Sequence, residues 1–555
     1  MRKINTLIFM CFVFAVCAQD INPSEVTVIE GFIPQIPEFE KVKEVTKFLD
    51  TTKIDKTQEY NFLDKTLNIN YDIRPLNSAK VSGEKLSDLN RSTILVGGGS
   101  HFTSVSNITL NSLRDNDCSY GLTFNHFSNR YSDENSEKFK HSLNQIHLFG
   151  KKIFENNIFI VNIDYDRRSL QHEYKVYSES MNDTYKNRFF YSKIGGFVFS
   201  RELSKNEIKH RTHFFISDLN ELSENQIHFD TDLSKHIKGY PVKLEVVLDN
   251  YINYSNADDI VQQDVKILGL NSFVSFKKYN IDINLGFSFD GVLDSIEGNK
   301  ADLFPYLSLS KQLVRDILYV EGGIEANGYR NTIKSLSDDN PYIYAYGTKQ
   351  DVVLNNFKTL NLRTTEEKGG YIYMKNVIGD NEIFEGKLSY DFIKNKTIFY
   401  KVLYPNERYL TSYIDVWRLH AHANYNWKIN DLVGIHASAN YFYYDTIVSH
   451  HESFNGKLGL DLNLEEKIKI STSLSYLGAR KSVRGMDNGT AFTINFQDIL
   501  DLDPQFHGNI SIDYNYTKSI SGYLKINNIF NSKQDIFEGY QEIGRNAWLG
   551  LSYSF

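Results

Sequence analysis

The feature that most constrains the fold of this chain is a two-residue alternation of apolar and polar side chains. From Arg418 to Lys428 the odd positions are apolar and the even positions are polar, and the alternation resumes from Val433 to Tyr443. Successive side chains of a β-strand point to opposite faces of the sheet, so this segment predicts a long hairpin with one apolar face. The same alternation recurs in the segments 457–464, 468–476 and 509–516.

The links between the predicted strands show a second regularity, because tight turns alternate with long polar stretches. The tight turns are expected near Asn395, Asn430, Glu466 and Lys518. The long stretches are 404–412, 445–455, 482–504 and 531–546. Short links on one rim and long links on the other are typical of transmembrane β-barrels, with the short turns in the periplasm and the long loops outside the cell.

These two patterns together predict an all-β fold. Strands of about ten residues with a fully polar second face match what a tilted strand needs to cross a bilayer. We therefore expect a closed antiparallel transmembrane β-barrel of the outer-membrane type, with about 16–22 strands, located in the cell outer membrane. The sheet must close, because an open edge in lipid leaves backbone polar groups without partners. A secreted β-sandwich or propeller is the alternative, although its strands would be shorter or apolar on both faces.

The N-terminus has the layout of an export signal. Arg2 and Lys3 precede an apolar run that ends at Ala18 and is too short to span a bilayer, which predicts a cleaved signal peptide over residues 1–18. A lipoprotein signal through Cys17 is the alternative, but the preceding valine is bulky where such signals need a small residue.

The mature chain is expected to have two parts. Residues 93–555 are predicted to form the barrel, since convincing alternation starts near Ile94, and residues 19–92 a short periplasmic or lumen-threading segment. Loss of the signal peptide leaves Cys118 as the remaining cysteine, which excludes an intramolecular disulfide. The chain carries 61 Lys and Arg against 69 Asp and Glu, a formal net charge of −8. This acidity argues against a nucleic acid partner, which would require a basic face.

The last residues place Leu551, Tyr553 and Phe555 on one face of an extended strand. A terminal aromatic residue on the lipid-facing side resembles the signal by which the barrel-assembly machinery recognises bacterial outer-membrane proteins. We therefore expect outer-membrane lipid and this machinery as partners.

Several segments resemble a known family, the plug-less TonB-dependent-receptor-like outer-membrane β-barrels of Bacteroidota. They are residues 80–129, residues 149–157, residues 303–332 with the following NPYI, and residues 524–555. The resemblance implies an outer-membrane barrel for passage or uptake of a solute that it does not identify. The segment 19–92 is too short for the globular plug of a full receptor, which puts energised uptake in doubt.

A short segment near the mature N-terminus, Glu25, Val26, Thr27, Val28 and Ile29, resembles a TonB box. Such a segment works by adding a strand to the exposed sheet edge of its partner, here TonB or an outer-membrane lipoprotein. A stray strand or a packing segment is the alternative interpretation of this β-prone run.

Three histidines, His420, His422 and His436, are expected on the polar face of the hairpin and therefore in the lumen. Histidines two apart on a strand can share a metal ion, and His422 and His436 could be diagonal neighbours across the hairpin. Solvated channel lining is the preferred interpretation, so we expect neither a metal nor a cofactor. The run Gly97 to Gly99 lacks the downstream lysine and helix of a phosphate loop and is expected to permit close packing or bending.

No nucleophile elbow, metal-binding helix motif or CxxC is present in the sequence, so no enzyme activity is expected. The predicted function is a TonB-dependent-receptor-like or porin-like barrel for passage or uptake of a solute. The alternative is a non-transporting scaffold that docks other cell-envelope proteins.

Overall fold

The computed structural model describes residues 90–555 apart from 114, 133–136, 176–181, 202–206, 221–223, 254–262, 344–361, 380, 403–407, 466 and 488–491. Residues 1–89 lie outside the described residues. They include the predicted signal peptide, almost all of the predicted N-terminal segment and the stretch from Glu25 to Ile29. No helix among the described residues is long and apolar enough to cross a membrane.

The described residues form a closed wall of 22 antiparallel strands. In chain order the strands are β1 (Ser92–Gly99), β2 (Thr103–Asn111), β3 (Cys118–Ser132), β4 (Lys138–Ile153), β5 (Asn157–Lys175), β6 (Asn182–Ser200), β7 (Lys209–Asn220), β8 (Glu224–Ile237), β9 (Tyr240–Asn253), β10 (Asp264–Lys278), β11 (Ile281–Asp294), β12 (Lys300–Val314), β13 (Leu318–Arg330), β14 (Thr364–Ile378), β15 (Glu382–Val402), β16 (Tyr409–Lys428), β17 (Val433–Tyr444), β18 (Phe454–Leu464), β19 (Ile468–Leu477), β22 (Gln505–Asn515), β23 (Ile520–Asn527) and β26 (Asn546–Ser554).

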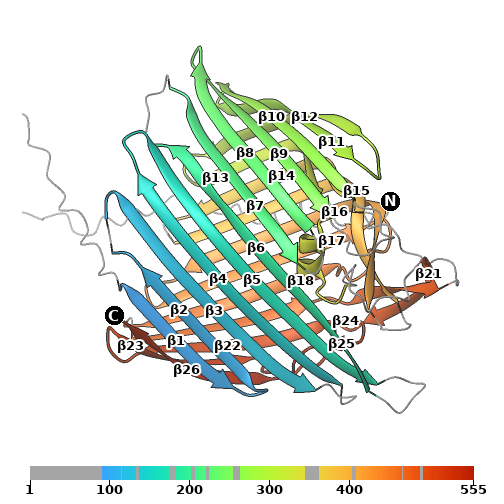
Figure 1. Ribbon diagram of the computed structural model, residues 1–555. Helices are drawn as coiled ribbons and strands as arrows, with labels where there is room; N and C mark the ends of the chain where they lie inside the picture. The colour runs from blue at the N-terminus through green and yellow to red at the C-terminus, as the bar shows by residue number, and fades with distance from the viewer. Residues whose placement is uncertain are drawn as a thin grey trace, which may run out of the picture. The chain divides into compact units, whose positions relative to one another are not determined.

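Each strand of the wall pairs with the next along the chain, and β26 returns to pair with β1 (Figure 1). The closing register places Ile94 opposite Tyr553 and Val96 opposite Leu551, so apolar residues of the two strands lie on the same face. The predicted fold class is confirmed, and the number of strands is at the upper end of the expected range.

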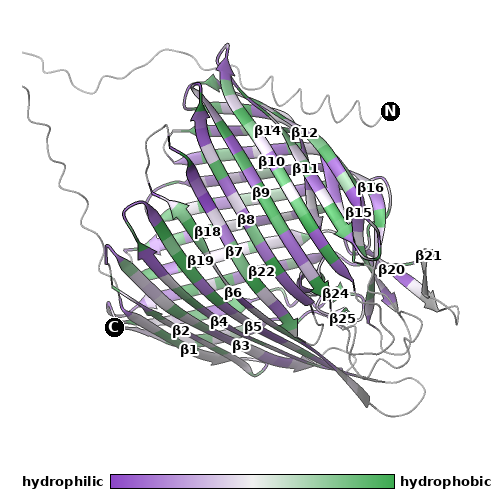
Figure 2. Ribbon diagram, turned by 45° about the horizontal axis from the view of Figure 1, so that its top comes forward, coloured by the Kyte–Doolittle hydropathy of each residue, from purple (hydrophilic) through white to green (hydrophobic). Residues whose placement is uncertain are grey.

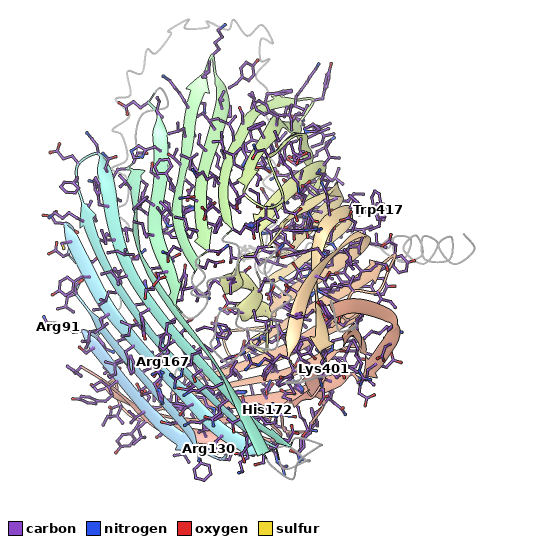
Figure 3. The ribbon with its side chains drawn as sticks, turned by 45° about the vertical axis from the view of Figure 1, so that its right-hand side comes forward. Arg91, Arg130, Arg167, His172, Lys401 and Trp417 are labelled. Atoms are coloured by element: carbon purple, nitrogen blue, oxygen red, sulfur yellow. The ribbon has the colours of Figure 1, made fainter. Side chains whose placement is uncertain are left out.

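Apolar and polar residues alternate along the strands, as the bands in Figure 2 show. On β5, for example, the exposed side chains are Phe159, Val161 and Ile163, while Asp164 contacts His147 of the neighbouring strand on the other face. Trp417, labelled in Figure 3, is likewise exposed and stacks on Tyr390 outside the wall. An apolar exterior around a polar interior is the arrangement expected of a barrel in lipid.

From β8 onward the links at one rim, which we name the turn rim, are shorter than those at the other, which we name the loop rim. Earlier in the chain the pattern does not hold, because residues 201–208 join β6 to β7 at the turn rim and residues 100–102 join β1 to β2 at the loop rim. The Asn430 side chain organises one short turn by accepting hydrogen bonds from the backbone N–H groups of Leu432 and Val433, at 2.9 and 2.8 Å. Strands β18 and β19 are joined by residues 465–467, and β22 and β23 by residues 516–519, which also confirms the turns predicted near Glu466 and Lys518.

The turn predicted near Asn395 is wrong. Asn395 lies inside β15, at a register shift between Ile393 and Lys396, and has a φ of 55°. The preceding strand β14 ends at Ile378 and β15 begins at Glu382. Asparagine tolerates the left-handed conformation, so the residue type that suggests a turn also fits a β-bulge.

The loop rim also contains ordered structure where only polar loops were predicted. The stretch 482–504 holds most of a hairpin formed by β20 (Arg480–Asp487) and β21 (Phe492–Leu502), and β20 pairs in parallel with the end of β15. The stretch 531–546 holds β24 (Asp535–Phe537) and β25 (Tyr540–Gln541). The hairpins β20–β21 and β24–β25 are local, whereas the pairing of β20 with β15 joins segments about 80 residues apart and is not revealed by a local pattern.

Links at the loop rim pack together with residues of the wall strands β3, β4, β6, β7 and β16 into an apolar cluster that we name the cap. Its buried members are Tyr131, Phe139, Phe189, Leu219, Ile333, Leu336, Tyr342, Ile343, Leu362, Tyr409 and Tyr540. The short helix α2 (Ile333–Asp339) contributes two of them, and its N-cap residue is Thr332. The Glu224 carboxylate accepts hydrogen bonds from the N–H groups of Ile333 and Lys334, at 2.8 and 3.2 Å, and so ties the helix to β8.

Polar groups buried around the cap are paired with one another. His172 and Lys401, both labelled in Figure 3, are almost fully buried on β5 and β15. His172 Nε2 lies 2.8 Å from a Glu137 oxygen, and the Lys401 ammonium lies 3.8 Å from a Glu538 oxygen. Buried charges require such partners, since an unpaired one would lose its hydration without compensation.

The glycines predicted to permit close packing lie at the seam between β1 and β26. Gly97 is opposite Gly550, and the Tyr523 hydroxyl of β23 covers both. A Cβ on either glycine would collide with that hydroxyl. The prediction of close packing for this stretch is therefore confirmed at Gly97.

Candidate functional site in the barrel lumen

A cavity of about 540 Å³ lies at the loop-rim end of β9 to β14. The ladder between β12 and β13 ends at the pair Leu307 and Ile324, although both strands continue toward the loop rim to Lys300 and Arg330. Residues of β9 to β12 line one side of the cavity, and residues of β13 and β14 beyond the end of this ladder line the other. The parting of two neighbouring strands therefore creates the cavity.

The lining of this cavity is strongly acidic. It contains eight carboxylates, from Glu245, Asp249, Asp290, Asp294, Glu297, Asp302, Glu325 and Glu366. It contains three cationic side chains, from Lys300, Arg330 and Arg363. The lining thus has a formal charge of −5 with every group ionised. A cleft lined by one sign of charge raises the local concentration of ions of the opposite sign.

Several of these carboxylates are held by cations of the wall. Arg330 lies 3.2 Å from an Asp294 oxygen, with both side chains almost fully buried, and Arg363 lies 3.3 Å from a Glu297 oxygen. The Lys387 ammonium lies 3.0 Å from a Glu325 oxygen. These ion pairs fix the shape of the cavity wall and leave the remaining carboxylates to set its charge.

Asp290 and Asp302 are directly opposite each other on β11 and β12. Neither carboxylate forms an ion pair within 4.0 Å among the described residues, although the charge of Lys368, which pairs with Glu366, acts on Asp290. Like charges facing each other across a strand pair repel and destabilise the sheet. A cation bound between them would remove this repulsion, so this pair is the part of the cavity best suited to a positively charged group.

Asp249 connects the cavity to a second polar cluster on the lumen wall. Its Oδ1 lies 2.8 Å from Nδ1 of His228 on β8. Nε2 of His228 lies 2.7 Å from Oδ1 of Asp230, and Nδ1 of His213 on β7 lies 2.9 Å from the same oxygen. Two imidazoles and two carboxylates thus form a continuous chain across three neighbouring strands.

The three histidines selected from the sequence do not form one cluster. His420 and His422 both lie near Oδ1 of Asn440, at 3.1 and 2.8 Å. His436 is 3.4 Å from an Asp461 oxygen. The proposed diagonal contact between His422 and His436 is wrong, because the register places them opposite Asn440 and Asn426 respectively.

Of the residues predicted to form a barrel-assembly signal, Leu551 and Tyr553 are exposed on β26, and Phe555 is exposed at its end. The ring of Tyr553 stacks on that of Phe555, with centroids 5.6 Å apart.

Sequence reasoning missed His213, His228, Asp230 and Asp249. A partial signal was present, because His228 and Asp230 are two residues apart and so share one face of a strand. The contacts with His213 and Asp249 depend on the register between three strands, which the sequence does not state.

Comparison with known proteins identifies this fold in solved structures. No protein-family model and no curated protein sequence matches the chain. The FrpB iron transporter from Neisseria meningitidis has 8% sequence identity, covers 85% of this chain and 83% of its own, and gives a TM-score of 0.61. A mutant of the ferric enterobactin receptor PfeA from Pseudomonas aeruginosa has 10% identity, coverages of 85% and 81%, and a TM-score of 0.58. The copper transporter OprC has 10% identity, coverages of 84% and 80%, and a TM-score of 0.57.

Identities this low establish the fold and nothing finer. The chain therefore has a 22-strand outer-membrane β-barrel fold like that of these transporters and receptors.

Proposed function

We propose that this chain is an outer-membrane barrel for passage or uptake of a solute, and that the acidic cavity selects solutes that carry positive charge. The observation that supports this most directly is the facing pair Asp290 and Asp302, which line a cavity with a formal charge of −5. Acidic residues along a pore favour cations by the same electrostatics. The fold shared with an iron transporter and a copper transporter is consistent with such a role.

We propose that the chain has a signal peptide over residues 1–18, an N-terminal segment over 19–92 and the barrel over 93–555, as the sequence predicts. Leu551, Tyr553 and Phe555 would serve recognition by the barrel-assembly machinery. We also propose that the chain is related to the plug-less TonB-dependent-receptor-like barrels of Bacteroidota, which it resembles in sequence.

Coupling to TonB through Glu25 to Ile29 is a separate element of the proposal. Deleting these five residues should abolish energised uptake in cells while leaving the amount of folded barrel in the membrane unchanged. Uptake that is unaffected by the deletion would remove this segment from the mechanism.

Flux through the purified barrel, reconstituted in lipid vesicles, tests the charge selectivity. We expect a small cationic solute to pass faster than an anionic solute of equal size. The double variant D290N/D302N should show a smaller preference, because two of the eight lining carboxylates are removed. The matched control is D513N, because Asp513 lies on the lumen face of β22, away from the lining of the cavity. Equal preference in the double variant and the wild type would contradict the role of the pair.

A scaffold that docks other envelope proteins is the second candidate, and the packed cap at the loop rim favours it. Eleven buried apolar residues join links of this rim to the adjoining wall strands in one cluster. A surface of ordered loops can present a fixed shape to another protein. The absence of any solute flux, together with a stable partner that co-purifies with the chain, would support this function over transport.

A further inference from the structure

The His213, His228 and Asp230 side chains form a compact group of potential metal ligands. His213 on β7 and Asp230 on β8 are direct cross-strand partners, and His228 precedes Asp230 by two residues on the same face. One ligand atom from each residue lies within 4.8 Å of the other two. Among the described residues, it is the group of histidine, cysteine or acidic side chains with three ligand atoms this close together.

We propose that these three residues bind a divalent transition-metal ion of the Zn²⁺ class. Two imidazole nitrogens and one carboxylate oxygen are a ligand set that zinc accepts, with the fourth position left for water or another ligand. Ligand atoms around tetrahedral zinc are roughly 3.3 Å apart, from bond lengths of about 2.0–2.2 Å. The two nitrogens are already 2.9 and 2.7 Å from the shared Asp230 oxygen, so only small side-chain movements would admit the ion.

Asp249 supplies the outer contact that a metal-binding histidine requires. Its Oδ1 is 2.8 Å from Nδ1 of His228. A carboxylate at this position accepts the proton of Nδ1, which leaves the lone pair of Nε2 directed at Asp230 and the proposed ion. Histidine ligands usually have such a second partner, which fixes the tautomer and raises the basicity of the ring.

Two aromatic rings hold the imidazoles in place. The ring of Phe197 stacks on that of His213, with centroids 4.1 Å apart and planes 7° apart. The ring of Phe215 stacks on that of His228, with centroids 4.6 Å apart. Rings that are already oriented lose less conformational entropy when an ion binds.

The degree of burial suits an exchangeable ion. The side chains of His213, His228 and Asp230 are 19%, 15% and 23% exposed, so the group is partly shielded but open to the lumen. The carboxylates of Asp230 and Asp249 provide two negative charges beside the ion. By contrast, His420 and His422 share the neutral amide of Asn440.

Metal binding by the purified full chain, without an affinity tag and after treatment with a chelator, tests this proposal. Titration with Zn²⁺ should give one bound ion per chain that requires these three residues. The variants H228Q and D230N should each lose that ion, while the control H422Q should retain it. Because the amide of D249N accepts the same proton less strongly, this variant should bind about 10- to 100-fold more weakly with unchanged stoichiometry.

X-ray absorption of the zinc-loaded wild type requires no variant and should show two imidazole ligands. Heat-modifiable gel mobility verifies that each variant is folded. The site would be refuted by folded wild type that binds no zinc at micromolar concentration, by an absorption spectrum without imidazole, or by equal stoichiometry in D230N. In any of these cases the two histidines form only a hydrogen-bonded network. The assay needs no solute flux, so its failure is distinguishable from failure of the proposed function.

Discussion

Gly550 is the position where one added methyl group should most directly disturb closure of the barrel. It lies on β26 between Gly97 of β1 and Tyr523 of β23. A Cβ at Gly550 would collide with the Tyr523 ring and with the carbonyl oxygen of Val96. The Tyr523 side chain can rotate away, but the Val96 carbonyl belongs to the backbone of β1 and cannot. The substitution Gly550→Ala must therefore shift the seam itself.

The expected cost follows from comparison with a neighbouring glycine. Overpacking of this kind typically lowers the free energy of unfolding by about 1–3 kcal/mol. Such a loss raises the unfolding equilibrium constant about 5- to 150-fold. Gly522 on β23 is the matched control, because the nearest atom to a Cβ there would be Cδ2 of Leu551, at an ordinary distance of 3.8 Å. Gly522→Ala should therefore change the stability little.

Urea titration of the barrel, followed by heat-modifiable gel mobility, measures this difference. The folded band of G550A should disappear at lower urea than those of the wild type and G522A. Adding Y523A to G550A should recover only part of the loss, since the collision with the Val96 carbonyl remains. Equal midpoints for G550A and G522A would refute the interpretation that close packing at the seam requires glycine.

Three further predictions concern the cap. Replacing Glu538 by Gln should loosen the loops of the cap and increase their cleavage by protease. The Glu538 carboxylate accepts hydrogen bonds from Ser482 and Arg484 at 2.7 and 2.9 Å, and removing one partner of a buried ion pair costs about 3–5 kcal/mol. Protease resistance equal to that of the wild type would contradict this prediction. Replacing Glu224 by Ala should destabilise α2 by about 0.5–2 kcal/mol, measured as faster hydrogen exchange at Ile333 and Lys334, since two N–H groups lose their acceptor. Burial, and next the charge of Arg480, lower the pKa of His450 from 6.5 to about 3. The neutral form of His450 therefore stabilises the fold above pH 6.5, and this contribution is lost as the pH falls from 6.5 toward 3. The loss is at most about 1.4 kcal/mol per pH unit. The urea midpoint should accordingly fall more between pH 7 and pH 5 for the wild type than for H450Q, and an equal fall would show that His450 is not responsible.

Comparison of particular elements shows how far the sequence could predict the fold. The hairpin expected from 418 to 443 corresponds to β16 and β17, because the alternation there is long and regular. The turn predicted near Asn395 is absent, because the positive φ of this residue belongs to a bulge inside β15. The hairpin of β20 and β21 is local, but its register shifts between Val483 and Arg484, and the polar stretch around it was predicted to be a loop. Its pairing with β15, about 80 residues earlier in the chain, could not be predicted from a local pattern.

The candidate site was less accessible to prediction than the wall. Alternation alone predicted that His420 and His422 share one face of a strand, and the structure places both beside Asn440. The facing of Asp290 and Asp302 required the register of β11 with β12. The cavity beside them required the parting of β12 from β13, which no local pattern indicates.

The sequence by itself determined that this chain forms strands with one face for lipid and one for the lumen, because the direction of a side chain along a strand depends only on local backbone geometry. It also determined that short and long links alternate in the C-terminal part of the chain. Only the tertiary structure decided the number of strands, the glycine seam, the acidic cavity and the meeting of His213 with Asp230. The reason is that these features depend on register and closure, which bring together residues from different strands.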